Sequence, residues 1–155
     1  MRRKSLILIA AILAAFSTPP VSSQSVNNYR VVHGWPTLPD GVVLGPAAGV
    51  AVDSKGHLWV FQRGNRIWQE PLSLEPISYP TVIQFDGNSG KVLNMWGADS
   101  FAMPHGLTID DQDNIWLTDV ALHQVFKFSP EGKLLLTIGE PGVPGNDKRH
   151  FNRPT

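Results

Sequence analysis

The chain has 155 residues, enough for one domain of ordinary size, and its 13 Lys and Arg residues balance 13 Asp and Glu residues. It contains no cysteine, which excludes disulfides and thiolate chemistry, and it has no basic stripe that would attract nucleic acid. With 14 glycines, 13 prolines and only 17% charged residues, the composition favours a turn-rich β protein over a helical one.

The first 23 residues have the layout of a secretory signal peptide. Three basic residues, Arg2 to Lys4, precede an apolar run over 5–16, and a small, polar stretch follows up to Ser23. The run is shorter than the ~20 residues that a membrane anchor needs, and no later segment is long and apolar enough to cross a bilayer. We therefore expect a secreted or periplasmic protein. Loss of the leader would leave ten basic and thirteen acidic residues, a formal charge of −3.

Beyond a leading strand and linker predicted within 24–43, short alternating runs recur with the same layout. Gly49, Asp53 and Trp59 return 57 residues later as Gly106, Asp110 and Trp116. The strands predicted in the first unit are 49–52, 57–62, 81–85 and 92–96, and those in the second are 107–109, 114–118, 124–128 and 134–138.

Four-stranded units that repeat every ~40–50 residues are typical of β-propeller blades. We predict an all-β propeller fold with one blade at 44–98, which carries a loop insertion at 69–80, and a second blade at 99–140. Residues 141–155 are expected to form a loop and the start of a third blade. A propeller closes with roughly four to eight blades, so we expect an N-terminal fragment of a longer protein. The alternative is a two-blade chain that closes by oligomerising.

Two residues depart from the repeat at positions that should face the central channel. His105 stands at the start of an inner strand, where the first blade has Ala48 and the third has Thr155. Arg63 follows a strand of the first blade, where the second blade has Val120. Equivalent positions of different blades converge on one axis, so a channel metal would take one ligand per blade. His105 is thus a candidate metal ligand and Arg63 a candidate carboxylate clamp. The structural alternatives are a turn histidine and a solvated loop arginine.

Other polar residues are expected to have structural roles. Asp53, Asp110 and Asp119 are predicted to cap turns with their side chains rather than to bind metal. His57 is predicted to be a turn residue, and His123 is also assigned a structural role because its equivalent in the first blade is an arginine.

The two units resemble NHL repeats, whose pattern is P-x-G-[IL]-x-[VI]-D-x-x-G-N-[IL]-[YW]-[VL]-x-D. The segments "GVAVDSKGHLWVFQRGNRIW", "FAMPHGLTIDDQDNIWLTDVALHQVFKF" and "PGNDKRHFNRPT" also resemble the peptidyl-α-hydroxyglycine α-amidating lyases, from about Gly45 onward. That resemblance implies a six-bladed propeller that cleaves a C-terminal α-hydroxyglycine to a peptide amide and glyoxylate. It also implies two metal ions, zinc and calcium.

By motif, the resemblance makes His105 of "PHGL" one of three zinc histidines and Arg63 of "FQRG" the active-site arginine. Val50 and Leu107 would offer backbone carbonyls to the calcium ion. The other two histidines, a tyrosine and the calcium-binding aspartate would lie in later blades, so the chain as it stands is expected to be inactive. Family members from animals have cysteine where Asn152 stands.

Two other functions stay open from the sequence. One is a non-catalytic NHL propeller that binds protein or carbohydrate, and the other is a different metal-dependent propeller hydrolase such as a lactonase. The presence of both Arg63 and His105 favours the lyase, acting on a peptide or a small α-hydroxyglycine compound, because a pure binding propeller needs neither residue. The oligomeric state is left unassigned.

Overall fold

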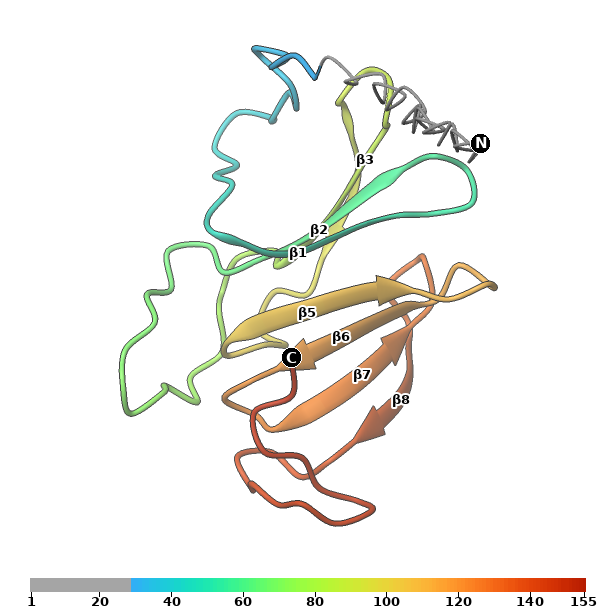
Figure 1. Ribbon diagram of the computed structural model, residues 1–155. Helices are drawn as coiled ribbons and strands as arrows, with labels where there is room; N and C mark the ends of the chain where they lie inside the picture. Colours follow the sequence, from blue (N-terminus) through green and yellow to red (C-terminus); the bar gives the residue numbers. More distant parts are fainter. Residues whose placement is uncertain (1–28) are drawn as a thin grey trace, which may run out of the picture. The chain divides into compact units, whose positions relative to one another are not determined.

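The computed structural model describes residues 29–155, and all of its strands lie within the unit Val32–Thr155 (Figure 1). They form two four-stranded antiparallel sheets in which every strand pairs with the next one along the chain. This arrangement confirms the predicted all-β fold. The first sheet comprises β1 (Ala47–Val52), β2 (Leu58–Gln62), β3 (Val82–Phe85) and β4 (Val92–Trp96). The second comprises β5 (Pro104–Ile109), β6 (Ile115–Asp119), β7 (Gln124–Phe128) and β8 (Leu134–Ile138).

The first strand of each sheet, β1 and β5, begins earlier than its alternating pattern predicts, because each contains a β-bulge. In β1, Ala47 pairs with Gln62 and Gly49 with the adjacent Phe61, so Ala48 is an extra residue without a partner in β2. In β5 the register shifts in the same way between Pro104 and Leu107. A bulge interrupts the strict alternation of side chains, and the apolar pattern becomes regular only after it.

The core lies between the two sheets. β2 and β3 contribute Trp59, Phe61 and Val82, and the second sheet buries Ile115, Leu117, Phe126 and Phe128 in the same cluster. Phe101, in the connection between the sheets, stacks edge-on against Phe61 at 4.9 Å and against Phe126 at 5.3 Å between ring centroids. Neither sheet therefore buries its apolar face alone, as expected for stacked repeats.

β1 and β5 lie side by side at the inner edge of the two sheets (Figure 1). A Cβ atom on Gly49 would meet the backbone nitrogen of Leu107 at 2.7 Å, so the approach of β5 requires glycine there. In the same manner, the backbone of Thr155 lies against Gly106, 3.1 Å from the Cβ position. The chain thus continues past β8 to return to the inner edge of the second sheet.

In each sheet, an aspartate in the turn between the first two strands hydrogen-bonds to a tryptophan of the second strand. Asp53 accepts the indole N–H of Trp59 at 3.0 Å, and Asp110 accepts that of Trp116 at the same distance. Each carboxylate also accepts backbone N–H groups from residues two and four positions later. The predicted turn-capping role of both aspartates is confirmed. His57, within the first of these turns, hydrogen-bonds to Asp53 at 2.9 Å, in agreement with its predicted place.

The leading strand expected within 24–43 differs from the structure. Residues 29–43 contain no strand, and Thr37 alone makes an isolated parallel bridge to Lys91. A strand needs a neighbour to satisfy its backbone groups, and the side chains of Val31 and Val32 are exposed. The leader predicted at 1–23 lies outside the described residues. Within the described part, no helix has the length and apolar character to cross a membrane.

Candidate functional site

The fold brings together the two residues that depart from the repeat. Arg63 follows β2 of the first sheet, and its backbone N–H donates to the carbonyl of Pro46 at 3.1 Å. Its side chain reaches across to the second sheet, where Nε donates to the carbonyl of Pro104 at 2.8 Å. Because Pro104 directly precedes His105, this hydrogen bond holds the guanidinium beside the backbone that carries the histidine. The site therefore lies where the two sheets meet.

A third side chain, Trp68, joins the other two. The guanidinium carbon of Arg63 lies 5.3 Å from the centroid of the Trp68 ring, within the range of a cation–π contact. The same indole packs edge-on against the imidazole of His105, with the ring centroids 6.2 Å apart and the planes at 74°. We call Arg63, Trp68 and His105 the inter-sheet triplet.

The β-bulge in β5 explains the position of His105. The N–H of Gly106 donates to the side-chain hydroxyl of Thr118 at 2.7 Å, where the register between β5 and β6 shifts. His105 therefore falls within the interrupted part of the ladder, as Ala48 does in the first sheet. Bulges commonly redirect a side chain next to a functional site. Within residues 29–155, neither ring nitrogen of His105 has a hydrogen-bond partner, so its lone pair is open to a ligand.

The segment in front of His105 is fixed by a buried carboxylate. Asp119, at the end of β6, is fully buried and accepts the N–H groups of Ala102 and Met103 at 2.7 and 2.9 Å. Its other oxygen accepts the N–H groups of Ala121 and Leu122, each at 2.9 Å. Three of these four bonds are buried, and the fourth, from Leu122, is partly buried. The predicted capping role of Asp119 is confirmed. Asp119 also holds the segment that leads into β5, because it accepts the N–H groups of Ala102 and Met103.

The charge of Arg63 has no counter-ion in the described part of the chain. No ion pair among residues 29–155 involves it, and its hydrogen bond to Pro104 uses one of five N–H donors. Arg153 offers a contrast, since both of its terminal nitrogens pair with Glu70 at 2.9 and 3.0 Å. Arg63 is thus held in place while its terminal nitrogens stay available for an anion.

The fit to zinc is partial. A half-buried imidazole with both nitrogens unbonded suits zinc, but a zinc site takes three or four protein ligands. Within residues 29–155 no three His, Cys, Asp or Glu side chains gather closely enough to hold a metal ion. His105 therefore fits as one ligand of a set that this part of the chain does not complete.

The two residues predicted to contact calcium occupy matching places. Val50 in β1 pairs with Val60, and Leu107 in β5 pairs with Leu117, which are equivalent positions of the two sheets. β1 and β5 are both edge strands of their sheets and lie next to one another. Their carbonyls therefore have the same orientation relative to their own sheets, and carbonyl oxygens are suitable ligands for calcium.

Two other histidines, His123 and His150, have hydrogen-bond partners of their own. Nδ1 of His123 accepts the backbone N–H of Arg153 at 3.0 Å, and its pKa is lowered by burial and then by the positive charge of Arg153. His150 pairs with Asp147 at 2.9 Å, and this hydrogen bond raises the pKa of the imidazole. The structural role predicted for His123 agrees with this geometry.

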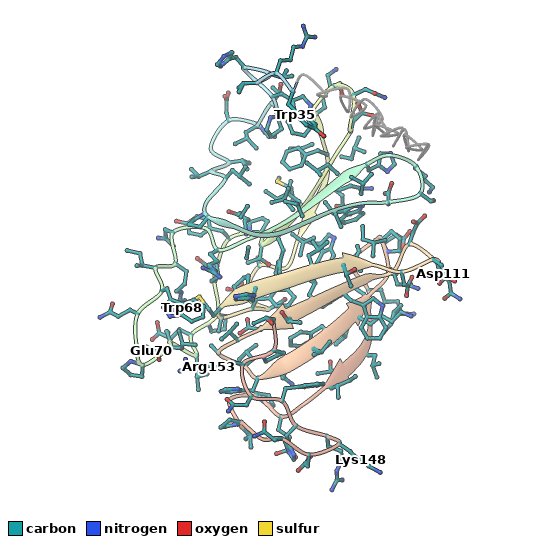
Figure 2. All side chains as sticks on the ribbon, viewed as in Figure 1. Trp35, Trp68, Glu70, Asp111, Lys148 and Arg153 are labelled. Atoms are coloured by element: carbon teal, nitrogen blue, oxygen red, sulfur yellow. The ribbon has the colours of Figure 1, made fainter. Side chains whose placement is uncertain are left out.

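Trp68 was not identified from the sequence, where it marks only the start of the insertion at 69–80. Figure 2 shows it at the same end of the sheets as Glu70 and Arg153, which are 83 residues apart in the chain. The available signal was its place five residues after Arg63, directly before the insertion that the second blade lacks. An aromatic residue near an unpaired arginine is a candidate stacking partner.

Comparisons with known proteins show what this chain is similar to. The model of the NHL repeat matches residues 101–128, which span His105 and the strands β5 to β7. The chain is 39% identical over 142 residues to peptidyl-alpha-hydroxyglycine alpha-amidating lyase 1 of Drosophila melanogaster, covering 83% of this chain and 26% of the relative. It is 38% identical over 152 residues to lyase 2 of the same organism, covering 91% of this chain and 37% of that protein. The resemblance expected from the motifs is confirmed as sequence similarity.

The chain spans well under half the length of these two relatives. Among solved structures, the selenomethionine-substituted virginiamycin B lyase from Staphylococcus aureus matches 70% of this chain and 30% of its own, with 16% sequence identity and a TM-score of 0.44.

Proposed function

We propose that the protein is an exported propeller lyase that cleaves a peptidyl-α-hydroxyglycine to a peptide amide and glyoxylate. The observation that carries this proposal is the inter-sheet triplet. Among residues 29–155, its arginine has no counter-ion and its imidazole has no hydrogen bond. Similarity to the two named lyases over most of the chain supports the same reaction.

The substrate has chemistry that suits these residues. A C-terminal α-hydroxyglycine carries a carboxylate, and a guanidinium binds a carboxylate through two parallel N–H donors. In the reaction the hydroxyl gives up its proton, a carbon–oxygen double bond forms, and the bond from this carbon to the amide nitrogen breaks. The nitrogen takes up a proton, so the reaction is balanced without an oxidant or a reductant. Arg63 would bind the carboxylate that becomes part of glyoxylate.

Two metal ions complete the proposal. His105 would be one of the ligands of a zinc ion, and the site would need further ligands that residues 29–155 do not supply. Bound zinc would act as a Lewis acid toward the substrate hydroxyl. Val50 and Leu107 would give their backbone carbonyls to a structural calcium ion between β1 and β5. The leader predicted at 1–23 supports export to the periplasm or the medium.

The direct test is the release of glyoxylate from α-hydroxyhippurate by the whole protein. We expect release that a chelator abolishes and added zinc restores. Arg63→Ala should abolish measurable turnover, because the carboxylate then lacks its clamp. Arg149→Ala, which removes an exposed arginine of the 141–155 loop, is the matched control and should retain activity. Zinc-replete protein that binds peptides but releases no glyoxylate would favour the non-catalytic binding propeller instead.

A further inference from the structure

We infer that Trp68 is a positioning residue that orients the Arg63 guanidinium to receive a substrate carboxylate. The inference rests on the proposed function for the nature of the ligand. The geometric evidence for the inference does not depend on the proposed function. It consists of the contacts that Trp68 makes with Arg63 and His105, which the repeat pattern does not require.

Two contacts together fix the plane of the guanidinium. The Nε–H···O bond to Pro104 anchors one edge at 2.8 Å, and the Trp68 ring covers one face at 5.3 Å. With Nε occupied, the paired donors of the two terminal nitrogens are left for a carboxylate, which is the bidentate geometry that arginine provides. An arginine that is already oriented loses less side-chain entropy when the ligand binds.

A second Trp–cation pair in the same chain shows what is different here. The ammonium of Lys127 lies 4.9 Å from the ring centroid of Trp116, and it also pairs with the Asp110 carboxylate at 2.9 Å. In that arrangement the cation has both an aromatic ring and an anionic partner. At Arg63 the ring and the cation are present without the anion, within the described residues. A substrate carboxylate would occupy the place that the aspartate takes in the other pair.

The loop that carries Trp68 is anchored on both sides of the site. Leu72 packs against a buried cluster that includes Ala102 and Met103, the residues just before Pro104. Glu70 makes its two-point ion pair with Arg153 in the loop that follows β8. The loop that carries the indole is therefore anchored near the backbone that carries His105, although Trp68 is still 43% exposed. That exposure leaves one side of the triplet accessible to a ligand.

The test compares a charged and a neutral ligand, so that a general loss of structure is distinguishable from a loss of carboxylate recognition. Hippurate has the carboxylate but lacks the reactive hydroxyl, and hippuramide replaces the carboxylate with an amide. We expect calorimetric titration of the zinc-loaded whole protein to show tighter binding of hippurate. In Trp68→Leu, hippurate affinity should fall about three- to tenfold, as expected for a lost cation–π contact, while hippuramide affinity stays constant.

Two further variants sharpen the result. Trp68→Phe keeps an aromatic face and should recover most of the preference for hippurate. Ile67→Ala, at a neighbouring side chain that is 79% exposed, should leave both affinities unchanged. With α-hydroxyhippurate as substrate, Trp68→Leu should raise KM by a similar factor and change kcat little, since the arginine remains present.

The outcomes separate the inference from the proposed function. Equal losses for both ligands in Trp68→Leu, or no loss for either, would overturn the positioning role even if the wild-type protein releases glyoxylate. A wild-type protein that does not prefer hippurate to hippuramide would overturn it as well. A selective loss of hippurate binding in a protein that releases no glyoxylate would support the positioning role and reject the lyase reaction.

Discussion

The first sheet, β1–β4, and the second sheet, β5–β8, follow one plan but contribute different residues to the site. Both have the bulge in the inner strand, the aspartate–indole tie and the same strand order. Where the second sheet places His105 in the bulge, the first has Ala48. Where the first sheet places Arg63 after its second strand, the second has Val120. The shared residues build the fold, and the two unshared residues meet in the triplet.

A third pair of equivalent positions shows how the plan adapts. Asp119 accepts four backbone N–H groups, whereas Gln62 in the first sheet accepts two, from Gly45 and Gly64. The amide of Gln62 then donates to the carbonyl of Pro80 at 2.7 Å, which a carboxylate cannot do. The exchange of Asp for Gln thus attaches the far end of the insertion at 69–80 to the first sheet.

The largest expected effect comes from making the two sheets alike at the bulge. His105→Ala gives the bulge of the second sheet the residue type that Ala48 supplies in the first, so the thermal unfolding midpoint should change little. Glyoxylate release should fall by about 10³-fold or more, because a Lewis-acid contribution of several kcal/mol is lost. His33→Ala, at an exposed histidine outside both sheets, is the control. Retained activity in His105→Ala would remove this residue from the site.

The next effect concerns the two capping side chains. Asp119→Ala leaves four N–H groups without their acceptor, three of them in buried hydrogen bonds, and should cost about 3 kcal/mol in the free energy of unfolding. Gln62→Ala removes fewer bonds to a neutral acceptor and should cost about 1–2 kcal/mol. Urea denaturation of the whole protein measures both. If the costs were equal, or in reverse order, the buried carboxylate would not be the stronger of the two equivalent caps.

A smaller effect is expected at the aspartate–indole ties. Trp59→Phe and Trp116→Phe each remove one indole N–H donor to a carboxylate while keeping an aromatic ring. Each should lower the free energy of unfolding by about 1 kcal/mol. Denaturant midpoints should shift by similar amounts for the two variants. A shift in only one of them would show that the tie supports one sheet and not the other.

The smallest effect is on pH dependence, and it involves the loop after β8. The lowered pKa of His123 means that the unfolded chain takes up a proton more readily, so this contribution to stability is lost as the pH falls below about 6.5. The raised pKa of His150 has the opposite sign: its contribution is present below about 6.5 and is lost as the pH rises through the raised value. NMR titration should place the His123 midpoint below that of His150. Asp147→Asn should lower the His150 midpoint and leave His123 unchanged, and a reversed order of midpoints would contradict both assignments.

The strands could be predicted because each has a short-range pattern. β4, β7 and β8 begin and end where alternation places them, and the repeat identifies the strands of one sheet from those of the other. The bulges could not be located in this way, because an extra residue breaks the alternation that defines a strand. The leading strand was not confirmed, because a segment forms a strand only when a neighbour satisfies its backbone groups.

The site was predictable where it departs from the repeat and hidden where it depends on a loop. Comparison of the two units singles out Arg63 and His105 because their equivalents, Val120 and Ala48, are apolar. Trp68 lies in the connection between β2 and β3, which is much longer than the connection between β6 and β7, so comparison within the chain does not single it out. Its position depends on the path of the insertion, which is held by a pair of residues, Glu70 and Arg153, far apart in sequence.

The β-bulge at the start of each inner strand has a consequence for how such sites evolve. A residue that takes no part in strand pairing can be exchanged without a compensating change elsewhere, and Ala48 and His105 show two residues of very different size in the same slot. A propeller therefore offers one substitutable position per repeat, all near the same axis. New chemistry can be acquired there one residue at a time, while selection on folding acts on the rest of the repeat.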